Sequence, residues 1–190
     1  GVCLLAAPLH ALVLNEIMYH PWEESAPGVD DKRLEWIELY NENADPLDLS
    51  GYFFSKGIDF VFPQGTYLLG RSFLVVCANR TAVEAKYGID ASLTIGDWSA
   101  ATALDNSGET IALANPSGLV VAQVAYNDRS RWPAGADGTG HTLALLTPYC
   151  DINDADNWTL SANLGGSPGA PNFGAEAAYR ETTILEDNEI

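Results

Sequence analysis

Three glutamates in the first part of the chain are of a type that could support acid–base catalysis. Glu16 lies in one apolar run, and Glu35 and Glu38 lie in the next. A glycosidase needs two carboxyl groups a defined distance apart across a cleft. Glu35 and Glu38 point to opposite faces of an extended chain, and among 26 acidic residues three neighbouring ones carry little weight. The sequence therefore favours a non-catalytic role for all three.

An acidic segment near the C-terminus offers oxygen ligands for a metal ion. Its four oxygen-bearing side chains are those of Asp151, Asn153, Asp154 and Asp156. Such ligands suit a hard cation such as calcium, although the segment lacks the glycine and the closing glutamate of an EF-hand loop. Asp and Asn side chains also cap turns by binding backbone amides. Calcium binding and turn capping both stay open, capping is favoured, and no other cofactor is predicted.

The sequence contains none of the common catalytic motifs that we sought. Beyond residue 11 it has two histidines, His20 and His141, and neither has the spacing of a zinc-binding pair. It has no Gly-x-Ser-x-Gly nucleophile motif, and the glycine-rich stretch 132–140 lacks the Gly-Lys-Ser/Thr of a phosphate-binding loop. We predict that the chain is not an enzyme and that both histidines make hydrogen bonds at strand ends.

The apolar run over 33–41 carries two aromatic residues that alternate with aliphatic ones. In an extended chain Ile37 and Leu39 share one face, and Trp36 and Tyr40 share the other. If exposed, Trp36 and Tyr40 would form a stacking surface for a ligand such as a sugar. Residues of this kind are more often covered by a neighbouring loop or sheet, and we favour that alternative.

The charge of the chain excludes some partners. The formal net charge is -17 at pH 7. A surface this negative repels the phosphates of nucleic acids and of anionic lipids. We therefore predict no nucleic-acid partner, and the one apolar stretch at the N-terminus is too short to span a bilayer.

The N-terminal residues and the cysteines bear on export. Residues 1–11 carry no charged residue and end in a sequence suited to signal-peptidase cleavage, so we interpret them as the remnant of a signal peptide. A buried first strand or a linker is the alternative. Loss of this segment removes Cys3 and leaves Cys77 and Cys150, which either pair in an exported domain or stay as free buried thiols.

Turn residues at close spacing divide the rest of the chain into short strands. The central strand is expected over 33–41, and further strands are expected over 12–19, 52–55, 58–62, 73–77, 109–114, 119–126 and 141–146. The Asn-Pro-Ser-Gly turn at 115–118 predicts a hairpin. Thr81 to Glu84 has the spacing of a capping box, and Gly88 marks where the short helix that follows should end. Together these elements predict an all-β, immunoglobulin-like antiparallel β-sandwich with one short inserted helix.

Six motifs give the sequence a more specific resemblance. They are, in chain order, residues 14–21 (LNEIMYHP), 35–41 (EWIELYN), 47–52 (LDLSGY), 106–109 (NSGE), 132–143 (WP and DGTGHTL) and 166–172 (GSPGAPN). This series resembles the bacterial lamin-tail domain family, of the type found at the N-terminus of secreted spore-coat-H-like proteins. The resemblance covers 12–172 and implies an immunoglobulin-like sandwich. It carries over no catalytic residue, and it leaves 173–190 as an acidic linker or the start of a next region.

The function that this implies is a non-catalytic interaction or scaffolding module of an exported bacterial protein, secreted or at the cell surface. It would be accessory to a larger downstream domain and would bind a protein or a cell-surface or matrix glycan. The alternative is a carbohydrate- or calcium-binding accessory domain of a secreted hydrolase. An autonomous enzyme is a third, less supported reading of the same sequence.

Overall fold

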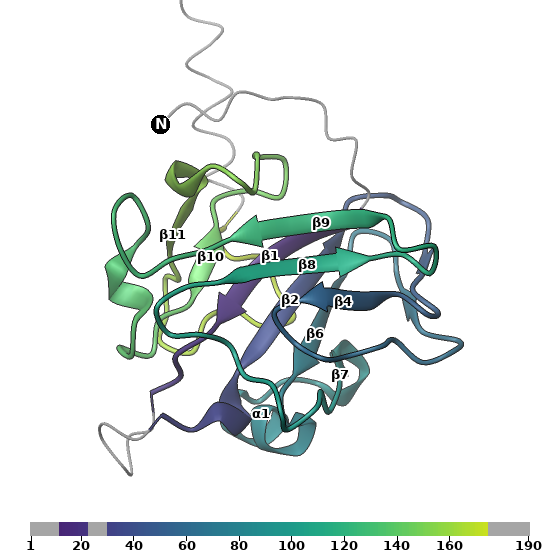
Figure 1. Ribbon diagram of the computed structural model, residues 1–190, viewed down its shortest axis with the longest axis horizontal. Coiled ribbons are helices and arrows are strands. Elements are labelled where there is room, and N and C mark those ends of the chain that lie inside the picture. Colours follow the sequence, from purple (N-terminus) through teal and green to yellow (C-terminus); the bar gives the residue numbers. More distant parts are fainter. Residues whose placement is uncertain (1–11, 23–29, 175–190) are drawn as a thin grey trace, which may run out of the picture.

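The computed structural model describes residues 12–22 and 30–174, and shows two sheets packed face to face. In Figure 1 the smaller sheet lies in front of the larger one. The larger sheet has the order β11 (Trp158–Leu160), β10 (Leu143–Leu145), β1 (Leu12–Met18), β2 (Trp36–Asn41), β6 (Phe73–Cys77), β7 (Thr94–Ile95). The smaller one has the order β4 (Phe53–Lys56), β8 (Thr110–Ala114), β9 (Val120–Ala125), and β3 (Leu47–Asp48) pairs separately with β5 (Tyr67–Leu68). The predicted all-β sandwich is confirmed.

Strands β1 and β2 form the centre of the larger sheet, and every residue in both is buried. Leu14 pairs with Leu39 and Ile17 with Ile37, and the register shifts between Leu14 and Glu16. This shift is a β-bulge at Asn15. Leu14 and Ile17 are three positions apart, so a regular strand would send them to opposite faces. The bulge lets both enter the core between the sheets, where they join Ile37 and Leu39.

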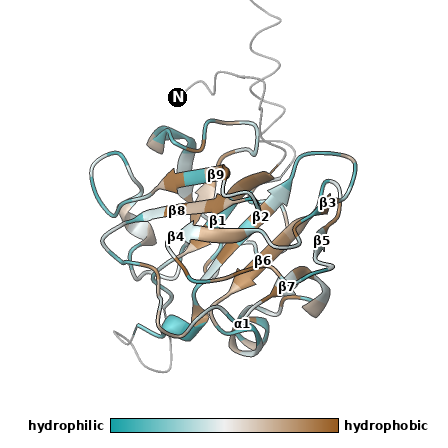
Figure 2. Cartoon of the chain, turned by 45° about the vertical axis from the view of Figure 1, so that its right-hand side comes forward, coloured by the Kyte–Doolittle hydropathy of each residue, from teal (hydrophilic) through white to brown (hydrophobic). Residues whose placement is uncertain are grey.

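The hairpin and the apolar core of the sandwich follow the sequence pattern. β8 and β9 pair antiparallel, and the Asn115 side chain accepts hydrogen bonds from the amides of Ser117 and Leu119 in the turn. Figure 2 shows that apolar residues concentrate on the strands and polar ones on the loops. The core between the sheets is closed by large side chains from both of them: Leu14, Ile17, Ile37, Leu39, Phe54, Val76, Ile111, Leu113 and Val124.

One short helix, α1 (Arg80–Tyr87), covers part of the outer face of the larger sheet. It ends at Gly88, as predicted, where the backbone is left-handed. The predicted capping box is wrong, because the N-cap is Asn79, whose side chain accepts a hydrogen bond from the amide of Ala82. Glu84 instead pairs with Arg80 one turn back. Four single 3-10 turns complete the helical content of the described residues: Lys32–Leu34, Ala91–Leu93, Ala134–Ala136 and Ala155–Asn157.

Three other details differ from the expectation. β7 pairs parallel with β6, so the sandwich is not wholly antiparallel. Residues 58–62 contribute only an isolated bridge at Val61, although Ile58, Phe60 and Phe62 alternate into the core as predicted. β11 was not predicted, because it has only three residues, in a polar stretch.

The described cysteines do not pair with each other. Cys77 is a free and fully buried thiol, and burial raises its pKa to about 12. Cys150 is disulfide-bonded and therefore is not a free thiol either. The remnant predicted at 1–11 lies outside the described residues, as does the predicted linker beyond Gly174. Within the described part of the chain, no helix is long and apolar enough to cross a membrane.

The packing of β2 predicts a large difference between two aliphatic truncations. Ile37 is fully buried between its strand partners Ile17 and Val76, so Ile37→Ala should lower the free energy of unfolding by about 3 kcal/mol. Val61 is 59% exposed, and Val61→Ala should change it by less than about 0.5 kcal/mol. Urea denaturation followed by tryptophan fluorescence measures both. Equal losses would contradict the assignment of Ile37 to the core.

Candidate functional site

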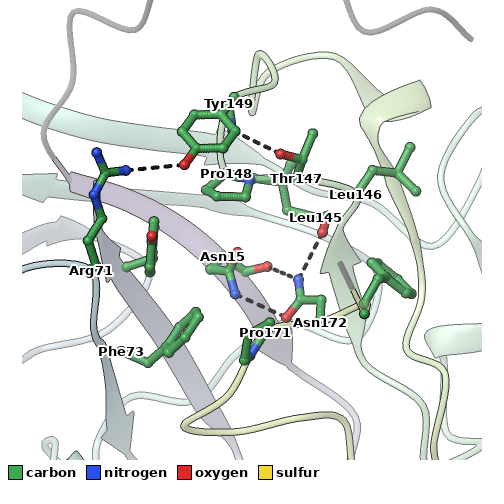
Figure 3. Close-up of a pocket in the computed structure, with 13 residues that line it drawn as sticks. Asn15, Arg71, Phe73, Leu145, Leu146, Thr147, Pro148, Tyr149, Pro171 and Asn172 are labelled. Carbon is green, nitrogen blue, oxygen red and sulfur yellow. Dashed lines mark hydrogen bonds between the residues drawn. The ribbon is translucent and has the colours of Figure 1, made fainter. Parts of the chain in front are cut away.

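A groove of about 220 Å³ opens at one end of the larger sheet, and it is the candidate binding site (Figure 3). It is formed by the bulge of β1, the adjoining ends of β2 and β6 with the loop before β6, the end of β10 with the loop after it, and the last described residues. The lining residues are Asn15, Tyr40, Arg71, Phe73, Leu145, Leu146, Thr147, Pro148, Tyr149, Pro171, Asn172, Phe173 and Gly174. Most of these side chains are apolar or aromatic, and Arg71 is the only cationic one.

The aromatic part of the groove comes from two neighbouring strands. Tyr40 at the end of β2 pairs across the sheet with Phe73 at the start of β6. Their ring centroids lie 4.8 Å apart with the ring planes tilted by 36°. Cross-strand aromatic pairs of this kind stabilise a sheet. The strand register thus fixes the position of both rings.

The loop before β6 holds Arg71 at the mouth of the groove. Its backbone is left-handed, with φ 55°, and its amide donates to the carbonyls of Asn41 and Asn43. Gly70 lies so close to Ala44 that an added Cβ would come within 1.9 Å of the Ala44 carbonyl oxygen. The loop is therefore clamped in a single arrangement. From it, the Arg71 guanidinium donates to the Tyr149 hydroxyl at 3.1 Å, and its hydrogen bond with Tyr40 raises the pKa of Arg71.

The C-terminal segment closes one side of the groove through Asn172. The Nδ2 of Asn172 donates to the carbonyls of Asn15 and Leu145, both at 2.9 Å, and its Oδ1 accepts from Asn15 Nδ2 at 3.0 Å. Figure 3 shows these bonds joining the bulge of β1 to the end of β10. Asn15 and Asn172 are 157 positions apart in the sequence. The segment before Asn172 forms no helix or strand, as predicted, but is ordered by these long-range bonds.

Behind this wall, Glu16 and Glu38 lie directly opposite each other on β1 and β2, and both are fully buried. Glu16 accepts hydrogen bonds from the Thr142 hydroxyl and from the amide and hydroxyl of Ser167. Glu38 accepts from Asn15 Nδ2 at 2.8 Å and from the amide of Gly169 at 2.6 Å. Covering these carboxylates is thus the main role of residues 166–169.

Burial controls the protonation of this pair. It raises the pKa of Glu16 to about 7, although the hydrogen bonds from Thr142 and Ser167 act in the opposite direction. Burial, together with the neighbouring Glu16, raises the pKa of Glu38 well above its usual value. Like charges opposite each other destabilise a sheet, so a protonated Glu38 relieves the repulsion. Neither carboxyl group lines the groove, and both are enclosed by hydrogen-bond partners within the described residues.

Glu35 lies in a separate place from this pair. It is fully buried, and its carboxylate is 2.9 Å from Lys32 Nζ and accepts from the amide of Leu104 at 2.8 Å. Burial raises the pKa of Glu35 to about 7. The structure therefore brings together Glu16 and Glu38 but not Glu35.

The acidic residues at 151–156 act as caps and ion-pair partners. The Asp151 side chain accepts from the amide of Asn153, and that of Asp154 accepts from the amide of Asp156. Arg131 forms ion pairs with both Asp154 and Asp156. Among the described residues no group of three or more His, Cys, Asp or Glu could hold a metal ion. This geometry matches the capping alternative.

The proposed surface of Trp36 and Tyr40 is not present. Trp36 is fully buried, and its ring packs edge-on against Tyr87 of α1 at a centroid distance of 6.0 Å. Tyr40 is 8% exposed and forms part of the wall of the groove. The exposed alternative is wrong, because Tyr87 of α1 covers Trp36 and Phe73 of the neighbouring strand packs against Tyr40. The favoured alternative, covered aromatic residues, describes both.

The two histidines lie at strand ends and make hydrogen bonds, as expected. His20 Nδ1 is 2.5 Å from Asp137 Oδ1, and His141 Nδ1 is 2.9 Å from the Ser161 carbonyl oxygen. The two histidines therefore have different hydrogen-bond partners.

The groove itself was not predicted from the sequence. Its one available signal was Arg71, a lone cation between a glycine and a serine ahead of an apolar strand.

The raised pKa of Glu16 predicts that stability falls as pH rises. The stabilising contribution of protonated Glu16 is complete below pH 4.5, its usual pKa, and is lost as pH rises through about 7. Relative to Glu16→Gln, the wild type should lose about 3 kcal/mol of unfolding free energy between pH 4.5 and 8. Ser167 and Thr142 carry hydroxyls that can accept from the new amide.

Urea denaturation across this pH range measures the difference. Glu84→Gln is the control, because hydrogen bonds from Thr94 and Arg80 hold the pKa of Glu84 below its usual value. That variant should follow the wild-type pH profile over the same window. A Glu16→Gln profile parallel to the wild type would show that folding does not raise the pKa of Glu16.

The pairing of Arg131 with Asp154 and Asp156 predicts little response to calcium. The guanidinium occupies the two carboxylates that a cation would need, so millimolar calcium and chelator should give the same Tm. Arg131→Gln frees both carboxylates and serves as the comparison. A wild-type Tm several degrees higher in calcium would instead support a metal site.

Comparison with known proteins places this geometry in a family. Residues 6–128 of the 190 match the lamin tail domain, an immunoglobulin-like and generally non-catalytic domain family. No curated protein matches the chain in the comparison that was made. β10 and β11 lie beyond the match, yet they pair onto β1 and complete the larger sheet. The match spans well over half of the sequence, and together with the observed sandwich it shows that this chain belongs to the lamin tail domain family.

Proposed function

We propose that this chain is a non-catalytic interaction module of an exported bacterial protein, accessory to a larger downstream domain such as that of spore-coat-H-like proteins. The observation that carries the proposal is the groove, which combines apolar walls with a fixed arginine on a strongly acidic chain. Interaction surfaces are typically enriched in aromatic residues and arginine. A partner protein, or a partner molecule at the cell surface, would thus meet a preformed site.

The arrangement of polar residues supports binding over catalysis. Glu16, Glu35 and Glu38, the acids with the strongest burial, are enclosed by hydrogen-bond partners. A protein partner is favoured over a glycan by the five tryptophans, since each of them is buried or half-buried and none offers an exposed ring for sugar stacking.

Peptide display on the full 190-residue chain tests this function with two matched variants. Leu146 and Leu119 are both exposed leucines, at the groove and in the β8–β9 turn respectively. Selected peptides should bind the wild type and Leu119→Asp equally, and should bind Leu146→Asp at least tenfold more weakly. The reason is that the aspartate removes apolar surface and adds charge only at the groove.

Two outcomes would contradict the proposal. One is the absence of any selected peptide whose binding depends on Leu146. The other is hydrolysis of aryl glycosides by the purified chain that Glu16→Gln abolishes, because a catalytic Glu16 is incompatible with its enclosed position.

A further inference from the structure

We propose that the groove captures the free C-terminus of a partner polypeptide, with the α-carboxylate at Arg71 and the last apolar side chain between the aromatic and proline walls. This inference rests on the proposed function and specifies its ligand. The groove has one charged group at its mouth and an apolar interior. A chain end with an apolar last residue presents the same two groups on one carbon atom.

The first support is the charge pairing of the described cations. Ion pairs with carboxylates occupy Lys32, Arg33, Arg80, Arg129 and Arg131. Among the described residues no carboxylate lies within ion-pair distance of Arg71 or of Lys56, and of these two cations only Arg71 lines the groove, where its hydrogen-bond partners are the hydroxyls of Tyr149 and Tyr40. On a chain of net charge -17, Arg71 thus places at the groove a cation that has no carboxylate partner among the described residues.

The second support is the geometry of the Arg71 donors. A guanidinium has five N–H donors in a planar fork, and the hydroxyl bonds to Tyr149 and Tyr40 use a minority of them. Its side chain is exposed while its backbone is clamped by Asn41 and Asn43. Little conformational freedom is therefore lost when the fork takes a carboxylate in two parallel hydrogen bonds.

The third support is the size and lining of the interior. A volume of about 220 Å³ lies below the range of roughly 300–1,000 Å³ typical of pockets for drug-sized ligands. It suits one or two residues of a peptide. Phe73, Leu145, Pro148 and Pro171 supply apolar contacts, and the amides of Asn15 and Asn172 are already bonded to each other and to the fold.

An internal Asp or Glu of a partner fits this site less well. In Asp or Glu the side chain itself carries the carboxylate, so the apolar group must come from another residue. Acidic stretches would also be repelled by the net charge of this chain. An α-carboxylate brings a single negative charge directly beside the apolar side chain.

Calorimetric titration of the full chain with short peptides tests the inference. The probe is the pentapeptide Gly-Gly-Ser-Gly-Phe as the free acid, compared with its C-terminal amide. The free acid should bind at least tenfold more tightly than the amide, and Arg71→Gln should reduce its affinity to the level of the amide. Arg71→Lys should recover part of the loss, since it restores charge without the fork.

Lys56→Gln is the matched control. Lys56 is an exposed cation on β4, in the smaller sheet, and its replacement changes the net charge by the same amount as Arg71→Gln. It should leave the affinity for the free acid unchanged. Thermal melts of all variants establish that they are folded.

Each contrary result identifies which proposal fails. Equal binding of acid and amide, or free-acid binding that survives Arg71→Gln, overturns the capture of a chain end. If display peptides still bind in a Leu146-dependent way, the proposal of an interaction module stands. Failure of both the pentapeptide and the display selection overturns both. Tighter binding of 3-phenylpropanoate than of the peptide would make the groove a small-molecule site and would also overturn the inference.

Discussion

The pairing of β1 with β2, with its bulge at Asn15, is the constraint on which the rest of the structure depends. The bulge directs the side chains of Leu14 and Ile17 into the same core, and it directs Glu16 to the outer face opposite Glu38. A central strand pair buried on both faces leaves no water to solvate these carboxyl groups. The chain must therefore supply donors from elsewhere, and residues 166–172 supply them. Without this segment, Glu16 would keep only the Thr142 hydroxyl as a donor, and Glu38 would keep only Asn15.

This requirement explains the composition of the C-terminal segment. An added Cβ at Gly166 would come within 2.5 Å of Glu16 Oε1, so only a glycine lets the backbone approach the carboxylate. The amides of Ser167 and Gly169 can then point at Glu16 and Glu38. Asn172 completes the contact by bonding to β1 and to the end of β10. The segment whose amides donate to the two carboxyl groups also forms one wall of the groove.

The sequence was sufficient for the elements whose signals are local. Alternation identified β2, the Asn-Pro-Ser-Gly turn identified the hairpin, and Gly88 marked the end of α1. The bulge at Asn15 could not be predicted, because nothing in seven residues distinguishes an interrupted strand from a bulged one. The coverage of Trp36 and the groove at Arg71 depend on contacts between distant segments, which no local pattern encodes. Likewise, a polar and glycine-rich stretch indicated only the absence of regular structure, although its partners make it a fixed part of the fold.

The extent of the family match adds a last step to this argument. Tyr40, Arg71 and Phe73 lie inside the matched range of 6–128, whereas the wall formed by residues 145–149 and 171–174 lies beyond it. The matched part supplies a rigid floor and a charge, both set by strand register and by the clamped loop. Of the remaining part, residues 146–149 belong to a loop after β10, and loop residues tolerate substitution better than paired strands. The shape of this part of the wall can therefore change without disturbing the sandwich, so the residue that the proposed site would accept can differ while the cation at its mouth stays in place.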